Sequence, residues 1–365
     1  MAASRAVQHL KATYTFLKTP IIISAPMRVF AGPDLAVATS RAGGLGFIGP
    51  GVRPTDLDSK LEKARSLLQQ TPIPAHDSIS ANASDIDCLP IGVGFQLFDG
   101  DLEVAAAAVR KHRPAAAWLF VPASGQSELD QWTLRIRRES PSTKIWIQIG
   151  SVAEAVAAAK STHAPDVLVV QGIDAGGHGL RKGAGIVSLL PEVADALQEL
   201  GSEIPLVGAG GVADGRGVAA VLATGVAAGA VMGTRFLASN EAEIKKGYQE
   251  DVLRVSDGGQ STIRTDLFDR LQGRDDWPPR YDGRAIINGS VRDDLAGMEL
   301  KQNKQIFQEQ LKNGSIGWGE DGRMTAYVGS AVGLVRAVDS AQEIIERSRG
   351  EAKAALQLAL DELGN

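Results

Sequence analysis

The segment Val169-Val-Gln-Gly-Ile-Asp-Ala-Gly-Gly-His-Gly-Leu180 joins a short apolar run to a stretch in which glycines surround a single histidine. The apolar beginning is typical of a buried β-strand, and the glycines indicate that the strand ends at about Gln171. We therefore predict a strand followed by a loop that carries His178. A titratable side chain on a loop behind a buried strand is a common way to build an active site on a rigid scaffold.

Seven further apolar runs of this kind occur along the chain, and amphipathic stretches lie between them. The runs are continuous rather than alternating, as expected when both faces of a parallel sheet are covered. The predicted strands are 20–25, 44–48, 90–95, 116–121, 144–149, 166–171, 204–209 and 229–233. The predicted helices between and after them are 33–42, 53–69, 101–112, 128–138, 152–162, 187–200 and 214–224.

This alternation predicts an α/β fold with parallel strands and right-handed crossovers. Eight units suit a closed (β/α)₈ TIM barrel over residues 1–239 at least as well as an open doubly wound sheet. The polar, proline-containing segment 71–89 is expected to be a long loop. Residues 240–325 lack the alternation and are expected to form a smaller, mostly helical cap after strand eight. Two amphipathic stretches, 330–347 and 351–363, predict C-terminal helices that pack back on the barrel within 326–365.

Composition excludes several classes of protein. The 365 residues carry a net charge of −5 and give no general attraction to nucleic acid. Cys88 is the single cysteine, which rules out an intrachain disulfide and a cysteine-based zinc site. No apolar run is long enough to span a membrane, so we expect a cytoplasmic protein without a membrane partner. The first 18 residues contain no acid, which leaves a mitochondrial presequence as the alternative. A homodimer is compatible with the sequence.

Two glycine-rich segments follow the seventh and eighth predicted strands. They read Gly208-Ala-Gly-Gly-Val-Ala-Asp-Gly-Arg216 and Met232-Gly-Thr-Arg-Phe236. The loops at these places in a TIM barrel often bind phosphate, because glycines let backbone N–H groups approach the oxygens. The first segment also matches the dinucleotide pattern G-x-G-x-x-A, but that pattern belongs to a first βα turn with an acid about 20 residues on. Residues 224–232 contain no acid. Tight turn geometry alone is the other interpretation of these glycines.

His178 is the candidate catalytic residue, as a general base or as a donor to an anionic substrate. Structural hydrogen bonding within a loop is the alternative. The other histidines are typical of surface or helix-end residues; they are His9, His76, His112 and His163. No set of side chains has metal-ligand spacing around His178, so no metal is predicted. The absence of a G-x-S-x-G motif argues against covalent hydrolysis. A phosphate site beside one base points to a phosphorylated substrate or a phosphate-bearing cofactor such as FMN.

Six motifs, in order, now resemble those of one family. They are Ile21-Ile-Ile-Ser-Ala-Pro-Met27, Ala42-Gly-Gly-Leu-Gly-Phe47, Ile91-Gly-Val-Gly-Phe-Gln96, Gln171-Gly-Ile-Asp-Ala-Gly-Gly-His178, Ala209-Gly-Gly-Val-Ala-Asp-Gly-Arg216 and Met232-Gly-Thr-Arg-Phe236. The sequence is similar to the nitronate monooxygenases, formerly called 2-nitropropane dioxygenases, and most of all to their fungal-type members. The segment Tyr281-Asp-Gly-Arg-Ala285 continues the resemblance into the predicted cap.

The resemblance implies a flavoprotein in which the barrel binds FMN. It implies oxidation of alkyl nitronates by O₂ to a carbonyl compound and nitrite, through one-electron transfer to the flavin. Where neutral nitroalkanes are also accepted, the motif histidine, here His178, removes the α-proton. The implied flavin contacts are Ala25, Pro26, Met27, Gln96, Gln171, Gly176 and Gly177, with Gly210, Gly211, Gly233 and Thr234 at the phosphate. Gln96 departs from the asparagine of many bacterial members.

An apolar pocket for a small alkyl chain is expected from Met27, Phe95 and cap residues, for which Trp277 and Tyr281 are the candidates. Three other functions remain open at this point. A flavin-dependent enoyl-acyl-carrier-protein reductase would share the barrel and an Ala-Gly-Gly-His motif, but would use NAD(P)H. A phosphate-binding barrel isomerase or aldolase would contain no flavin. A flavin-binding protein without catalytic activity would be yellow but would neither oxidise nitronates nor release nitrite.

Overall fold

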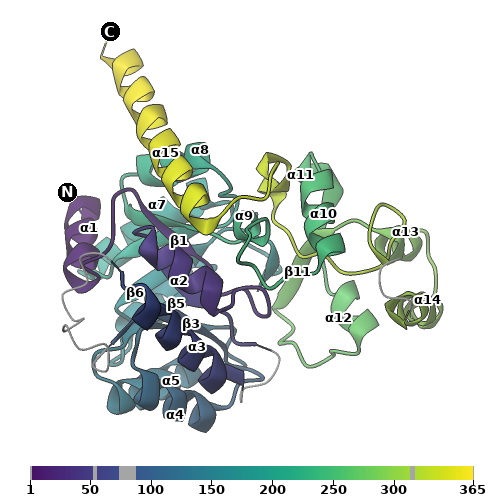
Figure 1. Cartoon of the computed structure of the whole chain (residues 1–365), viewed down its shortest axis with the longest axis horizontal. Coiled ribbons are helices and arrows are strands. Elements are labelled where there is room, and N and C mark those ends of the chain that lie inside the picture. The colour runs from purple at the N-terminus through teal and green to yellow at the C-terminus, as the bar shows by residue number, and fades with distance from the viewer. Residues whose placement is uncertain (1, 52–55, 74–87, 313–316, 365) are drawn as a thin grey trace.

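Eight parallel strands close into a barrel in the computed structural model, which describes residues 2–51, 56–73, 88–312 and 317–364 (Figure 1). Each strand pairs with the next in the order β1-β2-β3-β4-β5-β6-β8-β9, and β9 closes on β1. The predicted (β/α)₈ barrel is confirmed, and every predicted strand overlaps an observed one. The barrel strands are β1 Ile21–Ser24, β2 Leu45–Ile48, β3 Leu89–Gln96, β4 Pro114–Phe120, β5 Lys144–Ile149, β6 Val167–Gln171, β8 Leu206–Ala209 and β9 Ala227–Met232.

Helices surround the barrel and bury their apolar sides against it. They are α2 Pro33–Arg41, α3 Asp56–Gln70, α4 Leu102–His112, α5 Gln126–Glu139, α6 Val152–Lys160, α7 Ile186–Glu199, α8 Gly215–Ala223 and the short α9 Thr234–Leu237. Asp101, Ser151 and Asp214 cap α4, α6 and α8 by accepting hydrogen bonds from backbone N–H groups of the first turn. Residues 53–55 of the predicted second helix and 74–87 of the predicted long loop lie outside the described residues.

Three large aromatic side chains fill the barrel interior. The ring of Phe47 lies 5.1 Å from that of Trp118 and 5.3 Å from that of Trp146, centroid to centroid. Gly92 makes room for them, because a Cβ there would lie 2.2 Å from the Phe47 ring. The helix α1 Ala2–Thr13 leads to Tyr14, whose hydroxyl accepts a 2.9 Å hydrogen bond from Trp146 Nε1. The interior is thus packed and closed from the amino-terminal side, and the carboxyl ends of the strands are left for the site.

The C-terminal part differs from the prediction of two helices at 330–347 and 351–363. Residues Ser330–Leu334 form a single 3₁₀ turn, η2, and one long helix, α15 Ala341–Leu363, begins after it. A capping box between Ser340 and Glu343 sets the start of α15. Gly350 does not interrupt the helix, because one internal glycine costs only about 1 kcal/mol and the packing of α15 on α8 and α2 outweighs it. Figure 1 shows the end of α15 projecting beyond the barrel.

A small antiparallel sheet joins the barrel to the cap. Residues Gly177–Leu180, predicted as a loop, form strand β7, which pairs with β11 Tyr281–Ile286, and β11 pairs with β10 Thr262–Thr265. The prediction of a loop was wrong because this strand exists only through pairing with residues 100 positions away in the chain. The pairing sets Gly283 opposite His178.

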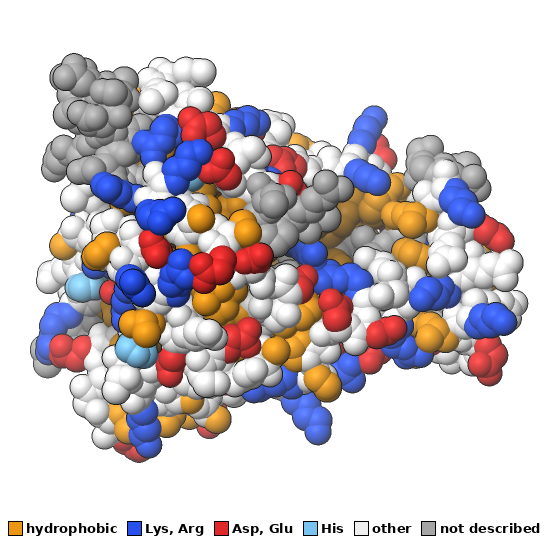
Figure 2. Space-filling view, turned by 90° about the horizontal axis from the view of Figure 1, so that it is seen from below, with side chains coloured by type: hydrophobic (Ala, Val, Ile, Leu, Met, Phe, Trp, Pro, Cys, Tyr) orange, Lys and Arg blue, Asp and Glu red, His pale blue; other side chains and the backbone are white. Residues whose placement is uncertain are grey.

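The remaining cap elements are helical and have their own apolar contacts. They are α10 Lys246–Arg254, α11 Gly258–Ser261, α12 Leu267–Gln272, α13 Gly289–Leu295 and α14 Leu300–Lys312. Leu267, Phe268 and Phe307 belong to one buried cluster of the cap. Hydrophobic side chains are visible between the barrel and the cap in Figure 2, and charged side chains of both signs are interspersed over that face. Among the described residues, every helix is too short or too polar to cross a bilayer.

An ionic network centred on Asp339 ties α9 to α15, and it yields a stability prediction. The carboxylate binds the buried guanidinium of Arg235 and accepts two 3.0 Å hydrogen bonds from Arg347. The pKa of Asp339 lies below its usual value. The hydrogen bond from Arg347 is the largest cause, and the charge of Arg235 also lowers the pKa. We expect Asp339→Asn to lower the free energy of unfolding by about 2 kcal/mol at neutral pH, since Arg235 keeps its charge in a buried position.

The pH dependence of this loss follows from the lowered pKa. A carboxyl group with a depressed folded-state pKa stabilises the protein above its ordinary pKa of about 3.9, and that stabilisation is lost as the pH falls through the folded-state value. The difference between wild type and Asp339→Asn in urea unfolding should therefore shrink below about pH 4. A difference that stays constant down to acid pH would contradict the ionic role of Asp339.

Candidate active site

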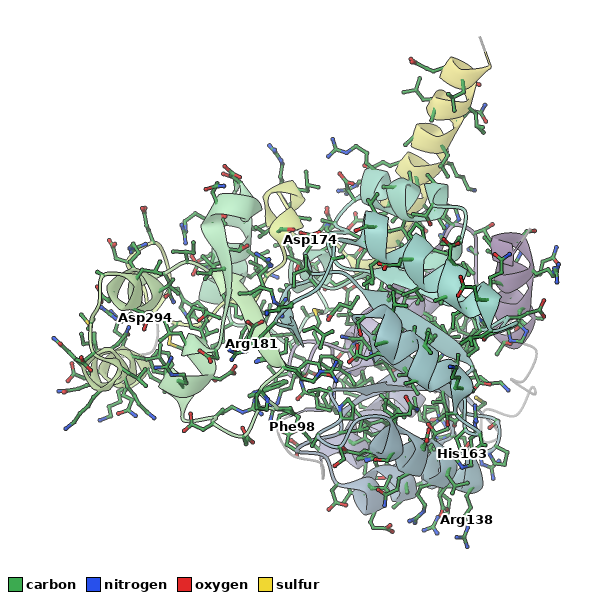
Figure 3. All side chains as sticks on the ribbon, turned by 180° about the vertical axis from the view of Figure 1, so that it is seen from behind. Phe98, Arg138, His163, Asp174, Arg181 and Asp294 are labelled. Carbon is green, nitrogen blue, oxygen red and sulfur yellow. The ribbon has the colours of Figure 1, made fainter. Side chains whose placement is uncertain are left out.

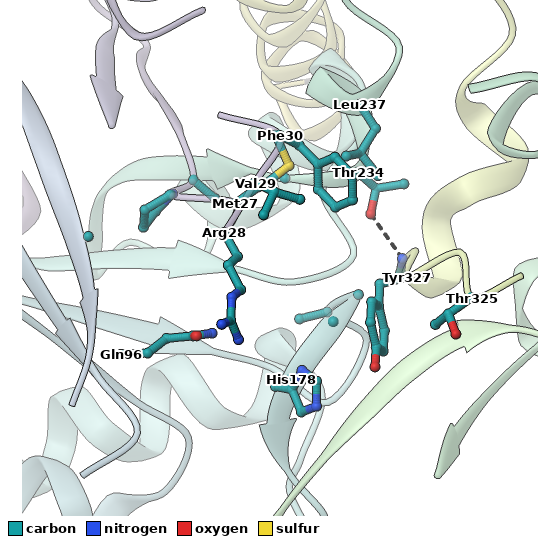
Figure 4. Close-up of a pocket in the computed structure, with 18 of the residues that line it drawn as sticks. Met27, Arg28, Val29, Phe30, Gln96, His178, Thr234, Leu237, Thr325 and Tyr327 are labelled. Carbon is teal, nitrogen blue, oxygen red and sulfur yellow. Dashed lines mark hydrogen bonds between the residues drawn. The ribbon is translucent and has the colours of Figure 1, made fainter. Parts of the chain in front are cut away.

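A cavity of about 850 Å³ lies where the carboxyl ends of the barrel strands face the cap. Its volume is at the upper end of the range of roughly 300–1,000 Å³ that is typical of small-molecule and cofactor sites. It is lined by all twelve residues that were predicted to be catalytic or to contact the cofactor: Ala25, Pro26, Met27, Gln96, Gln171, Gly176, Gly177, His178, Gly210, Gly211, Gly233 and Thr234. The structure thus brings together side chains from five barrel strands and their following loops (Figure 4).

Glycines form one wall of the cavity. Gly210 and Gly211, directly after β8, have φ values of +98° and +76°, a region that residues with a Cβ rarely adopt. Gly233 follows β9 directly and caps α9, which begins at Thr234. Thr234 Oγ1 accepts a 2.9 Å hydrogen bond from the backbone N–H of Gly329, which leaves the hydroxyl proton available to a ligand. Glycine backbone and one side-chain hydroxyl therefore line this part of the cavity.

Amide and apolar side chains form the wall at the strand ends. Gln96 ends β3 and Gln171 ends β6, and Gln148 in β5 accepts a 3.0 Å hydrogen bond from Trp118 Nε1. Ala25, Pro26 and Met27 turn away from β1, and a Cβ at Gly94 would lie 2.3 Å from the Pro26 ring. A wall of this composition suits a planar heterocycle, which needs close approach of backbone and a few amide contacts.

His178 connects the cavity to a buried carboxylate of the cap. Its Nε2 lies 2.9 Å from Oδ2 of Asp269, and the side chains are 9% and 5% exposed. The hydroxyl of Tyr327 donates a 3.3 Å hydrogen bond to the other carboxylate oxygen, Oδ1. Burial, together with the Asp269 charge, raises the pKa of Tyr327 well above its ordinary value, so the phenol stays protonated and donates.

The carboxylate fixes the tautomer of the imidazole. A carboxylate has only acceptor atoms, so a hydrogen bond to it requires the proton on Nε2 of His178. The unprotonated nitrogen of the neutral ring is then Nδ1. A histidine held in this way by a carboxylate can accept a proton at Nδ1 and share the resulting positive charge with Asp269. The arrangement has the features of a general base.

Aromatic rings hold the imidazole plane. Trp277 stacks on His178 with centroids 3.6 Å apart and planes 2° apart, and Tyr327 lies 5.1 Å from it at a tilt. Of the two cap candidates from the sequence, Trp277 lines the cavity. Tyr281 does not belong to the lining; it is buried behind Phe120, which does. Met27 and Phe95 line the cavity as expected.

The other described histidines lie outside the cavity. His163 lies on the outer surface of the barrel, far from the cap (Figure 3). The same view shows Asp174 and Arg181 near the cap. His112 is the last residue of α4, a helix end as expected; its side chain is 1% exposed, and its Nε2 contacts Asp58 at 2.8 Å. His76 lies outside the described residues. Within the described residues, no group of three histidine, cysteine, aspartate or glutamate side chains is arranged to hold a metal ion.

Sequence reasoning missed Asp269, Tyr327 and Arg28 of this site. Asp269 lies on α12 next to the buried Phe268, and nothing in the local pattern separates it from a solvent-facing acid. Tyr327 precedes the 3₁₀ turn and pairs with Ala285 of β11 through an isolated bridge. Arg28 directly follows the motif 21–27, which was predicted to contact the cofactor. That position is the one sequence feature that could have indicated a place for Arg28 in the site.

The sequence of this chain is similar to those of known proteins. A family model described as nitronate monooxygenase matches residues 11–87 and 133–347. The protein described as nitronate monooxygenase npaC from Metarhizium robertsii is 53% identical over 350 residues, covering 96% of this chain and 95% of that protein. A nitronate monooxygenase from Neurospora crassa is 36% identical over 368 residues, covering 96% and 94%.

A solved structure of FabK from Thermotoga maritima is similar in fold alone, with a TM-score of 0.73 at 23% identity over 97% of this chain and 98% of that chain. The barrel and its capped, glycine-walled cavity define a TIM-barrel enzyme that acts on small molecules. The chain belongs to the nitronate monooxygenase family and is an oxidoreductase. Membership of this family suggests a flavin cofactor.

The contact between His178 and Asp269 predicts one tautomer. With histidine labelled by ¹⁵N, the neutral His178 ring should carry its proton on Nε2. Asp269→Leu removes the acceptor and should shift the population toward the Nδ1-protonated form. His178→Asn provides the resonance assignment.

His112 offers a matched control, because its Nε2 also contacts a carboxylate. Asp58→Leu should change the His112 signals and leave those of His178 unchanged. An Nδ1-protonated His178 in the wild type, or no response to Asp269→Leu, would show that Asp269 does not set the tautomer.

Proposed function

We propose that this protein binds FMN and catalyses the oxidation of alkyl nitronates by O₂ to a carbonyl compound and nitrite. The observation that carries the proposal is the meeting of all twelve predicted residues on one cavity, with His178 in its wall. We propose further that neutral nitroalkanes are accepted after His178 removes their α-proton.

The residues of the cavity fit FMN. The backbone N–H groups around Gly210, Gly211 and Gly233, with the Thr234 hydroxyl, suit a phosphate. The amides of Gln96 and Gln171 and the turn Ala25–Met27 suit the polar edge and the face of an isoalloxazine ring. When bound, FMN would supply one-electron oxidation of the nitronate, with O₂ as the final oxidant.

The protein's own residues have two tasks in this scheme. The first is proton removal, in which Nδ1 of His178 takes the α-proton and the C–H electron pair forms the C=N bond of the nitronate. Asp269 stabilises the imidazolium that results, and Tyr327 keeps Asp269 in place. The second task is exclusion of water, for which the cap supplies Trp277, Leu271 and Met324 to the cavity wall.

The visible spectrum of the purified protein tests cofactor, redox role and substrate class together. We expect a yellow protein whose flavin absorption is bleached by ethylnitronate without O₂, and is restored with nitrite release when O₂ is admitted. Rapid anaerobic bleaching by NADH or NADPH, with no response to ethylnitronate, would favour an enoyl reductase. A colourless protein that takes up no FMN would favour an isomerase or aldolase. A yellow protein that shows neither response would be a non-catalytic flavin-binding protein.

Replacement of His178 tests the base. His178→Asn should lower kcat/KM for neutral nitroethane by at least about 100-fold, the usual contribution of a general base. Turnover of preformed ethylnitronate should stay near the wild-type rate, because that substrate has already lost its α-proton. His163→Asn, on the outer barrel surface, is the matched control. An equal loss with both substrates would mean that His178 serves binding or structure instead.

A further inference from the structure

Arg28 is a fixed cation in the cavity wall, directly behind the predicted cofactor segment. Its backbone carbonyl accepts a 2.8 Å hydrogen bond from Gly51 N–H, and its Nε donates to Gly51 carbonyl at 3.2 Å. Nη2 lies 3.5 Å from Oδ2 of Asp99. These contacts come from two different loops and hold the side chain in one place, so the guanidinium is already ordered before any ligand binds.

Part of this guanidinium group stays open to the cavity although its contacts hold it in place. The Arg28 side chain is 27% exposed and belongs to the cavity lining. Figure 4 shows the Arg28 side chain directed into the same part of the cavity as Gln96 and His178.

A second guanidinium group lies beside Arg28. Asp99 contacts Arg274 at 3.1 Å as well as Arg28, and Asp276 lies 3.9 Å from Arg274. Burial is the main cause that lowers the pKa of Arg28, and the charge of Arg274 is the next. The two carboxylates lie outside the cavity lining, whereas both arginines belong to it. Among the described residues of the lining, the cations are Arg28, Lys245 and Arg274, and the acid is Glu243, so the lining itself carries a net positive charge.

The same assembly holds the base. Arg274 lies over the Trp277 ring at 5.3 Å, and Trp277 stacks on His178. When His178 removes an α-proton from a nitroalkane, the negative charge that develops is carried by the two nitro oxygens. A planar group with two oxygens can accept hydrogen bonds from two neighbouring guanidinium groups, here those of Arg28 and Arg274. A donor placed where charge develops stabilises the transition state as well as the product.

We propose that Arg28, supported by Arg274, binds the paired oxygens of the nitro or nitronate group while His178 lies at the α-carbon. The identity of the substrate in this assignment rests on the proposed function. The binding of an anion by Arg28 does not depend on it. Arg28 contributes no covalent or redox step. The proton passes from the α-carbon to His178, and Arg28 stabilises the charge that remains on the oxygens.

Sodium nitrate is the probe, because it is a planar oxyanion that needs no turnover. Titration of the purified flavin-loaded protein, followed by calorimetry and by the change in flavin absorption, should show nitrate binding. Arg28→Met should weaken it by about 10–100-fold, which corresponds to about 1.4–2.8 kcal/mol, the size expected for a hydrogen bond to a charged group. Arg28→Lys keeps the charge and should restore part of the affinity. Arg280→Met is the matched control, since Arg280 pairs with Glu154 and lies outside the cavity lining.

Kinetics supply the second measurement. With preformed ethylnitronate, Arg28→Met should raise KM more than it lowers kcat, whereas with neutral nitroethane kcat/KM should fall further because charge develops during the reaction. If Arg28→Met does not fold, the nitrate titration and the kinetics are measured with Arg28→Lys and Arg274→Met instead.

The outcomes separate this proposal from the proposed function. Nitrate binding that depends on Arg28, in a protein that does not oxidise nitronates, would support the anion site and overturn the function. Nitronate oxidation with nitrate affinity and KM unchanged in Arg28→Met would overturn the anion site and leave the function standing. Loss of FMN from Arg28→Met, with nitrate affinity unchanged on reconstitution, would assign Arg28 to the flavin and overturn the proposal.

Discussion

The antiparallel pairing of β7 with β11 is the constraint on which the site depends. It sets His178 opposite Gly283, and a Cβ at Gly283 would lie 2.5 Å from the Tyr327 ring. Glycine at that position lets Tyr327 approach the imidazole and reach Asp269. A buried ion pair fixes β11 to the third strand of the same sheet, β10: Arg264 Nε lies 2.8 Å from Asp282 Oδ1, and both side chains are less than 10% exposed. Without this sheet the cap would have no fixed register against the barrel, and the carboxylate would not meet the histidine.

The barrel could be predicted from the sequence, and the small sheet could not. Barrel strands are short apolar runs buried on both faces, so the signal for each lies within the strand itself. Strand β7 reads Gly-His-Gly-Leu, which has neither apolar continuity nor alternation. Strand β11 contains Asp282 and Arg284, charges that are accommodated because Arg284 donates to Ile173 carbonyl and Asp282 pairs with Arg264. Both strands owe their existence to partners far along the chain, which local patterns do not show.

The residues of the site likewise fall into those that local sequence patterns predict and those that depend on long-range contacts. The glycines and glutamines of the cavity stand at strand ends, where the barrel topology alone brings them together. Asp269, Trp277 and Tyr327 come from separate parts of the cap, and their meeting depends on how the cap folds. Asp269 shows the difficulty most clearly. It is a 4% exposed acid among the apolar residues of α12, and its burial is acceptable because His178 and Tyr327 satisfy both carboxylate oxygens.

His178 therefore belongs to two parts of the molecule. Its segment starts at Gln171, the last residue of a barrel strand, and ends in the cap sheet. The backbone between these points is fixed from the cap side, because Arg264 donates to the carbonyl of Ala175 at 3.3 Å and Arg284 to that of Ile173 at 3.4 Å. A shift of the cap sheet would move the imidazole relative to the glycine wall, which belongs to the barrel alone. The position of the imidazole relative to the glycine wall is thus set by the same contacts that join the cap to the barrel.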